Sequence, residues 1–323
     1  MFGLKNKKVP ALLLAALFLL LAAGCVRADE KTTVQESSGY SITDVTGSKI
    51  FFKEPPKRII SLSSSVDEIL LDLVVPERIA ALSILADDPG ICAAAAKAGT
   101  VSARVKGNSI ESILMLNPDL VLMPDWRGRE SAESLRSVGV AVYMYSTPVT
   151  LSEIEASIRN IAQIVNAREK GEELAQGMRN KLDRVRESLG EIPTAQRQTV
   201  AAMSLMGAFG GSGTTFDDLC KYAQVKNGLS LAGAEKNSII SKEMIVAIDP
   251  EIFILPSWDF GEANNAKNYV EQIRNDPAFS SVRAIKSNRL VQVHDAYLYS
   301  TSHYAVQAVE ELARAAYPDK FAE

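Results

Sequence analysis

Side chains suited to a bulky ligand follow an apolar run in the first half of the sequence. Trp126, Arg127 and Arg129 come after residues 120–123, and the other tryptophan of the chain is Trp258. Aromatic rings offer wide apolar contact faces, and guanidinium groups bind carboxylates, phosphates and anionic chelates. We therefore place these four side chains in a binding site. For Arg127 and Arg129, a role as solvated loop charges is the alternative.

A second group of ring-bearing side chains gathers near the end of the chain, in a predicted connection between a strand and a helix. Its members are His294, Tyr297, Tyr299, His303 and Tyr304. We assign Tyr297, Tyr299 and His303 to the same binding site. His294 or Tyr297 has the chemistry to ligate a haem iron, but a lone His or Tyr is more often a hydrogen-bonded structural residue.

The residues that catalysis or metal binding would need are scarce. The chain has only two histidines, whereas a zinc or manganese site needs several His and carboxylate ligands. A serine of residues 61–65 with His294 and Asp295 is a conceivable catalytic set. These serines are better explained as a strand end and a helix cap, with Ser65 and Glu68 forming a capping box. We predict no enzyme activity, no metal ion and no cofactor; an esterase-like enzyme and a carrier of a free metal ion remain alternatives.

Residues 109–126 recur as residues 241–258 at a constant offset and without a gap. The identical pairs are Ser109/Ser241, Glu111/Glu243, Ile113/Ile245, Pro118/Pro250, Pro124/Pro256 and Trp126/Trp258. In each copy a serine N-cap begins a short helix, and its first turn carries Glu111 or Glu243, where the helix dipole favours a carboxylate. A buried strand and a tryptophan follow, and ligands bind outside the carboxyl ends of such strands. Each copy therefore brings one Trp and one Glu to the same edge of its sheet.

Around this repeat, predicted strands alternate with predicted helices, which is typical of parallel sheets covered by helices. We expect an α/β protein with two Rossmann-like lobes, residues 40–150 and 191–323, and a ligand cleft between them. The spacing of apolar residues in 151–190 predicts one long linking α-helix. Two helices with a break near Asn166–Gly171 are the alternative. The length of 323 residues fits two domains, and the net charge of −4 does not suit nucleic acid binding. We expect a monomer.

The first residues have the layout of an export signal. Residues 1–24 combine basic residues, an apolar stretch and small residues at the cut, which predicts a signal peptide. The apolar stretch is shorter than the ~20 residues that a transmembrane helix needs. We expect lipidation of Cys25, with residues 25–39 as lipid anchor and flexible tether outside the cytoplasm; secretion without a lipid is the alternative. We expect Cys92 and Cys220 to be free and buried, and a disulfide is the alternative.

Short stretches along the chain match one known group of proteins. They are residues 57–62 with 68–70, 110–122, 242–251 and 284–291. In the order and spacing of these stretches the chain resembles the bacterial lipoproteins that bind vitamin B12, ferric siderophores or haem for ABC importers. The resemblance covers nearly all of the chain after Cys25. It implies two lobes on a rigid helix that close only slightly on the ligand, on the periplasmic side or the outer face of a membrane.

The resemblance also implies a partner and a class of ligand. In that family two glutamates dock onto arginines of the permease dimer of the importer, and they map to Glu111 and Glu243; two helix-start acids without a partner are the alternative. We favour a ferric siderophore as the ligand, with a corrinoid second and haem third. Residues 126–128 resemble the Trp-Arg-Gly stretch of B12-binding members, whereas Leu85 and Val105 stand where those members carry further aromatic residues.

Overall fold

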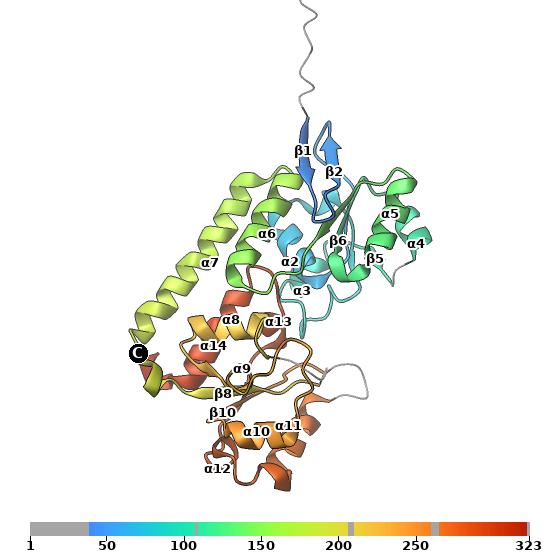
Figure 1. The fold of residues 1–323 in the computed structure, drawn as a ribbon. Coiled ribbons are helices and arrows are strands. Elements are labelled where there is room, and N and C mark those ends of the chain that lie inside the picture. The colour runs from blue at the N-terminus through green and yellow to red at the C-terminus, as the bar shows by residue number, and fades with distance from the viewer. Residues whose placement is uncertain (1–38, 107–108, 206–209, 260–264, 322–323) are drawn as a thin grey trace, which may run out of the picture. The chain divides into compact units, whose positions relative to one another are not determined.

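The computed structural model describes residues 39–106, 109–205, 210–259 and 265–321 (Figure 1). The predicted signal peptide, Cys25 and the predicted tether up to residue 38 lie outside these residues. Among the helices of the described chain, none has both the length and the apolar composition for crossing a membrane. The described chain begins with a β-hairpin, in which β1 (Tyr40–Thr43) pairs antiparallel with β2 (Lys49–Phe52).

A parallel sheet with strand order β5-β4-β3-β6-β7 forms the N-terminal lobe. Its strands are β3 (Ile59–Ser61), β4 (Ile79–Ser83), β5 (Arg104–Val105), β6 (Leu120–Pro124) and β7 (Val142–Tyr145). Its helices are α2 (Ser64–Leu73), η1 (Pro76–Arg78), α3 (Ala95–Ala98), α4 (Ile110–Leu114), η2 (Asp125–Arg127) and α5 (Arg129–Ser137). Ile59 and Leu120 belong to the core that α2 covers, whereas Ile60 and Val121 belong to the core under α4 and α5. Both faces of the sheet are therefore buried, which explains its continuous apolar strands.

Two helices, rather than one, lead from the first lobe to the second. They are α6 (Leu151–Ile164) and α7 (Arg168–Leu189), so the prediction of a single helix over residues 151–190 is wrong and the alternative is correct. The break has a local cause. Asn166 has φ of +55°, and the N–H groups of Asn166 and Ala167 donate to the carbonyls of Gln163 and Ala162. This is a Schellman end, which turns the chain out of the helix.

Helix α7 makes the connection between the lobes. Its 22 residues span about 33 Å, and it packs against α6 of the first lobe and α14 (Ala305–Ala316) of the second. Close packing with α6 depends on Gly171, because a Cβ atom there would lie 2.4 Å from the Cβ of Ala162. The predicted plan of two lobes joined by a helix therefore holds, with α7 as the linking helix (Figure 1).

The C-terminal lobe has its own parallel sheet, with strand order β11-β10-β8-β9. Its strands are β8 (Thr199–Ala202), β9 (Lys226–Asn227), β10 (Ile252–Leu255) and β11 (Leu290–Gln292). Its α-helices before α14 are α8 (Thr215–Tyr222), α9 (Gly228–Leu231), α10 (Lys242–Ile248), α11 (Ala266–Asn275), α12 (Arg283–Lys286) and α13 (Asp295–Leu298). Short 3-10 turns are η3 (Thr194–Gln196), η4 (Pro277–Phe279) and η5 (Pro318–Lys320). The predicted α/β class with parallel sheets in both lobes is confirmed.

The repeat in the sequence is also a repeat in structure. Ser109 caps α4 and Ser241 caps α10, and each hydroxyl accepts a hydrogen bond from the backbone N–H three residues later (3.3 and 3.2 Å). Each copy then turns through one left-handed residue, Asn117 with φ of +46° and Asp249 with φ of +47°. Asn and Asp tolerate this conformation better than most residues. Both predicted N-caps are confirmed.

An acidic residue after each turn binds the start of the neighbouring strand. Asp119 accepts hydrogen bonds from the N–H groups of Lys57 (2.6 Å) and Arg58 (2.9 Å). Glu251, its counterpart, accepts one from the N–H of Thr199 (2.6 Å). The acid at this position therefore fixes the strand register in both lobes, which explains why the repeat keeps it.

The cysteines of the described chain are buried free thiols, as expected from the sequence. Cys92 lies in the first lobe and Cys220 in the second. Burial raises the pKa of the Cys92 thiol to about 12, and it raises the pKa of Cys220 well above its usual value. Both sulfur atoms therefore stay protonated at neutral pH.

The contact between α6 and α7 yields a prediction with a control in the same helix. Gly171→Ala should destabilise the protein by roughly 1–3 kcal/mol, because the new methyl group overpacks the contact with Ala162. Gly177 faces open space, so Gly177→Ala should stabilise the protein by about 0.4–1 kcal/mol. Urea unfolding followed by circular dichroism measures both. Equal effects at the two glycines would contradict the close packing.

Candidate functional site

The N-terminal edge of the candidate site is η2, which follows β6 and carries two of the predicted residues. Trp126 is 64% exposed, and the guanidinium carbon of Arg127 lies 5.1 Å from the centroid of its ring. Arg127 Nη2 donates to the carbonyl of Leu62 (3.1 Å), and burial lowers the pKa of Arg127. Arg129 is exposed at the start of α5. The three predicted residues thus lie on one segment, and the Trp126 ring is the exposed apolar surface that this segment offers to a ligand.

Trp258 makes a contact from the C-terminal lobe to the N-terminal lobe. Its indole Nε1 donates to Asp88 Oδ2 (2.7 Å). Its ring lies against Gly90, where a Cβ atom would come within 2.2 Å of the ring. The N–H groups of Ser257 and Trp258 donate to Asp295 (3.0 and 2.9 Å), and burial raises the pKa of Asp295 to about 6. We call the contact of Trp258 with Asp88 and Gly90 the Trp258 latch.

A second contact between the lobes is buried and polar. Glu68 on α2 accepts hydrogen bonds from the hydroxyls of Ser300 (2.7 Å) and Ser302 (2.5 Å) and from the N–H of Ala93 (2.7 Å). Burial raises the pKa of Glu68. We call the contact of α2 with residues 300–304 the α2 seam. It joins the first lobe to the segment that precedes α14.

The seam overturns the expected capping box. Ser63, rather than Ser65, caps α2 by accepting a hydrogen bond from the N–H of Val66 (3.3 Å). The hydroxyl of Ser65 instead accepts one from the N–H of Thr301 (2.9 Å). Ser65 and Glu68 both bind the second lobe, so neither serves the end of its own helix. A local sequence pattern does not reveal this, because the partners lie more than two hundred residues away.

The structure divides the group of ring-bearing side chains near the C-terminus. His303 lies in the α2 seam, where its Nε2 is 3.0 Å from a carboxylate oxygen of α2 and its side chain is only 12% exposed. The hydroxyl of Tyr299 is 2.8 Å from that of Ser204, and burial raises the pKa of Tyr299. Tyr297 is half-buried beside His294, with ring centroids 5.6 Å apart. Tyr299 thus contacts the segment that directly follows β8.

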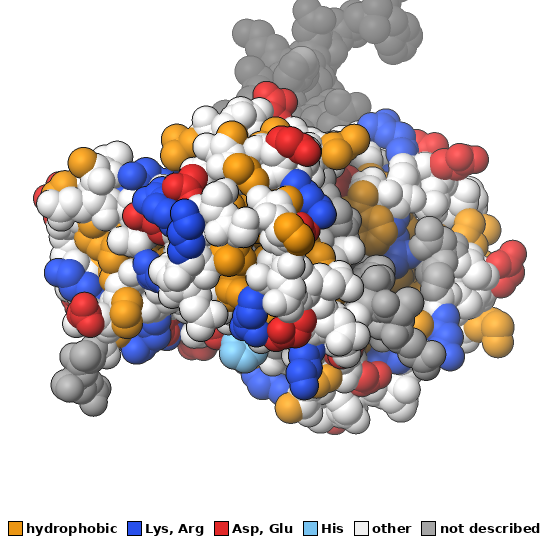
Figure 2. All heavy atoms as spheres, turned by 90° about the horizontal axis from the view of Figure 1, so that it is seen from below, with side chains coloured by type: hydrophobic (Ala, Val, Ile, Leu, Met, Phe, Trp, Pro, Cys, Tyr) orange, Lys and Arg blue, Asp and Glu red, His pale blue; other side chains and the backbone are white. Residues whose placement is uncertain are grey.

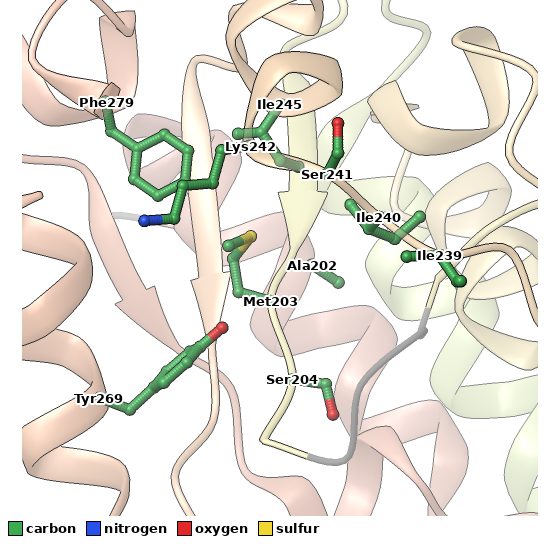
Figure 3. A pocket seen from close by; sticks show the side chains of 10 residues that line it. All are labelled: Ala202, Met203, Ser204, Ile239, Ile240, Ser241, Lys242, Ile245, Tyr269 and Phe279. Atoms are coloured by element: carbon green, nitrogen blue, oxygen red, sulfur yellow. The ribbon is translucent and has the colours of Figure 1, made fainter.

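A cavity of about 310 Å³ opens beside Ser204 in the C-terminal lobe (Figure 3). The residues that line it are Ala202, Met203, Ser204, Ile239, Ile240, Ser241, Lys242, Ile245, Tyr269 and Phe279. The hydroxyl of Tyr269, from α11, points into the cavity toward Met203. Sequence reasoning missed this cavity. Its walls come from four separate segments, and no residue spacing within any one of them predicts it.

The two predicted docking residues occupy equivalent places in the two lobes. Glu111 and Glu243 are exposed in the first turns of α4 and α10. The hydroxyl of Ser109 donates to Glu111 Oε2 (2.6 Å) and lowers the pKa of Glu111. A hydrogen bond from its own backbone N–H and one from Ser241 lower the pKa of Glu243. Each lobe therefore presents a carboxylate that stays charged at neutral pH and is open to a cationic partner.

The conceivable catalytic set is not brought together. His294 Nδ1 lies 2.7 Å from Glu311 Oε1, and Asp295 binds the backbone of residues 257–258. The Ser63 hydroxyl lies 2.7 Å from that of Tyr145. In the part of the chain that the structure describes, no group of three or more His, Cys, Asp or Glu side chains is placed to hold a metal ion.

Charges of both signs mix on the surface. On the face drawn in Figure 2, Lys and Arg side chains alternate with Asp and Glu, and the described residues form no continuous field of one sign. A protein that binds a polyanion would need a basic field. This face offers none among its described residues, in line with the net charge of −4.

Comparisons with known proteins agree with this geometry. A family model described as periplasmic binding protein matches residues 59–297. The uncharacterized ABC transporter substrate-binding lipoprotein YvrC of Bacillus subtilis is 25% identical and aligns over 97% of this chain and 97% of its own. A vitamin B12-binding protein of Vibrio parahaemolyticus is 31% identical over 40% of this chain and 46% of its own length.

A solved structure supports the fold. The apo form of the periplasmic haem-binding protein RhuT from Roseiflexus sp. RS-1 superimposes with a TM-score of 0.69 and 23% sequence identity, over 82% of this chain and 99% of its own. The family match covers both sheets and the linking helix α7. The chain therefore belongs to the periplasmic binding protein family, whose members are the extracytoplasmic substrate-binding components of ABC importers.

Proposed function

We propose that this chain captures a metal chelate between its lobes and delivers it to the permease dimer of an ABC importer, as a lipoprotein anchored through Cys25. The observation that carries the proposal is the structural repeat. It sets one exposed glutamate, Glu111 or Glu243, at the same place in each lobe. Two equivalent carboxylates match a partner that itself has two equivalent halves, because each carboxylate then meets the same cationic group.

A corrinoid is the ligand that we place first. The relative from Vibrio parahaemolyticus is named for vitamin B12, and the Trp126–Arg127 pair of this chain offers a broad exposed ring beside a guanidinium. This ranking moves the corrinoid ahead of the ferric siderophore that the sequence favoured. The siderophore remains the second candidate, because the exposed Arg129 beside Arg127 suits an anionic chelate. Haem is third.

Ligand entry requires a change at the Trp258 latch. The indole of Trp258 reaches from the C-terminal lobe and donates a hydrogen bond to Asp88 of the N-terminal lobe. A ligand that lies between the edges carrying Trp126 and Trp258 must therefore separate this contact. The α2 seam, which is buried, holds the lobes together while the latch opens.

The first prediction concerns the ligand and Trp126. Calorimetric titration with cyanocobalamin, a ferric tricatecholate, a ferric trihydroxamate and haemin should find saturable binding of at least one. Trp126→Ala should weaken that binding at least about tenfold, because aromatic anchors dominate such contacts. Phe51→Ala removes an exposed ring from β2 and should leave the affinity unchanged. No binding of any of the four chelates would overturn the proposal.

The latch gives a kinetic prediction. Trp258→Phe keeps a ring but loses the N–H donor, so ligand association should become about three to ten times faster, which corresponds to a net contribution of roughly 1 kcal/mol from this partly exposed hydrogen bond. The variant also leaves Trp126 as the sole fluorescent reporter for stopped-flow measurements. Asp88→Ala should have the same effect, and the double variant should add nothing. Unchanged rates, or fully additive effects, would show that the latch does not control entry.

Docking is tested by reversing charge at both lobes. Glu111→Lys with Glu243→Lys should reduce uptake in cells at least about tenfold and leave the calorimetric affinity for the chelate unchanged. The matched control is Glu77→Lys with Glu187→Lys, which makes the same change in net charge at exposed acids elsewhere. Normal uptake by the first pair, or equal loss in both pairs, would refute docking through these glutamates.

A further inference from the structure

The N-terminal lobe contains a small space that its own arginine fills. Leu62, Ile110 and Ile113 line this space together with Arg127, and only about 10 Å³ remains open. Arg127 enters from η2 and donates from Nη2 to the carbonyl of Leu62. A planar polar group therefore lies among apolar walls beneath the N-terminus of α4.

The cavity of the C-terminal lobe is the counterpart of that space. Lys242 and Ile245 occupy the positions of Ile110 and Ile113 in the repeat. Met203 corresponds to Leu62, because the two backbone N–H groups donate to carbonyls at matching positions of β10 and β6 (2.8 and 3.2 Å). The equivalent space in the second lobe is about 310 Å³ and open.

One position differs in a way that bears directly on this space. Directly after the repeat, at the same offset, Asp259 stands where the first lobe has Arg127. Its carboxylate accepts a hydrogen bond from the N–H of Ala266 (2.7 Å) at the start of α11. A short acidic side chain with this partner does not enter the cavity, so the space that an internal guanidinium fills in the first lobe is left for an external group.

The lining suits an uncharged group that combines apolar surface with an oxygen. Met203, Ile245 and Phe279 supply apolar surface. The Lys242 ammonium lies 2.6 Å from Asp276 Oδ2, so the two charges offset each other. The Tyr269 hydroxyl points inward, and within the described chain no hydrogen bond to it is made. A single ring that carries a hydroxyl would satisfy it, and the volume is at the low end for small-molecule sites.

We propose that this cavity binds one phenolic ring, with its oxygen hydrogen-bonded to the hydroxyl of Tyr269 and its faces against Met203 and Phe279. The ring has two chemical sources. It is either a free phenolic compound or a catechol arm of a ferric chelate held between the lobes. The second source rests on the proposed function, and the first does not.

The test uses the full chain without its chelate and 4-fluorophenol as the probe. Fluorine NMR should show saturable binding with a Kd between roughly 0.1 and 1 mM, a range set by the small number of atoms in the ring. The Met203 methyl resonance should shift in the same titration. Tyr269→Phe should weaken 4-fluorophenol about five- to tenfold and leave the binding of fluorobenzene, which lacks the hydroxyl, unchanged.

A variant that fills the cavity provides a second, independent test. Ile240 lies at the rim and is half-buried, so Ile240→Trp should abolish binding of the probe while the melting temperature confirms that the chain folds. Absence of saturable binding, an unmoved Met203 resonance, or equal binding by Ile240→Trp that folds normally would each overturn the pocket. Because Trp126 and cyanocobalamin are not part of this test, its failure leaves the chelate proposal standing.

Competition identifies the source of the ring. A ferric tricatecholate that displaces 4-fluorophenol from the wild-type chain but does not bind Ile240→Trp supports the pocket as the site of its catechol arm. A tricatecholate that binds without displacing the probe supports the pocket as a separate site for free phenolic compounds.

Discussion

A buried carboxylate on α2 determines how the two lobes meet. Glu68 belongs to the first lobe, and the hydroxyls of Ser300 and Ser302 that bind it belong to the second. A buried acid without partners would cost several kcal/mol, so this contact strongly favours a single arrangement of the lobes. The Trp258 latch lies between the same two lobes and depends on that arrangement. Both edges of the candidate site are therefore positioned by an interaction that no ligand needs to touch.

Two copies of one backbone plan carry different chemistry. Both copies share a serine cap, a glutamate in the first helical turn, a left-handed residue and an acid that binds the next strand. They diverge at the tryptophan and at the residue that follows it. Arg127 donates to Leu62 of its own lobe, whereas its counterpart Asp259 binds the N–H of Ala266. Trp126 is exposed, whereas its counterpart Trp258 reaches across to Asp88. The shared part suits a symmetric partner, and the divergent part suits an asymmetric ligand.

Local patterns in the sequence predict much of this fold. The two parallel sheets and the caps at Ser109 and Ser241 follow from the alternation of predicted strands and helices and from capping chemistry. The break after α6 was only an alternative, since the helical pattern continues through Asn166 and the left-handed turn becomes evident only from its hydrogen bonds. The roles of Glu68 and His303 were not predictable, because their partners are distant in the sequence. The cavity next to Tyr269 was not predictable either, because the residues that line it are distant from one another in the sequence.

The buried thiols have a consequence for the life of the protein outside the cytoplasm. Disulfide exchange and oxidation proceed through the thiolate. The pKa values of Cys92 and Cys220 lie far above neutrality, so almost no thiolate forms at either residue. The folded chain therefore resists covalent cross-linking and oxidative damage through these two residues, even in a compartment that oxidises accessible cysteines. An event that uncovers either sulfur would open it to disulfide exchange and oxidation.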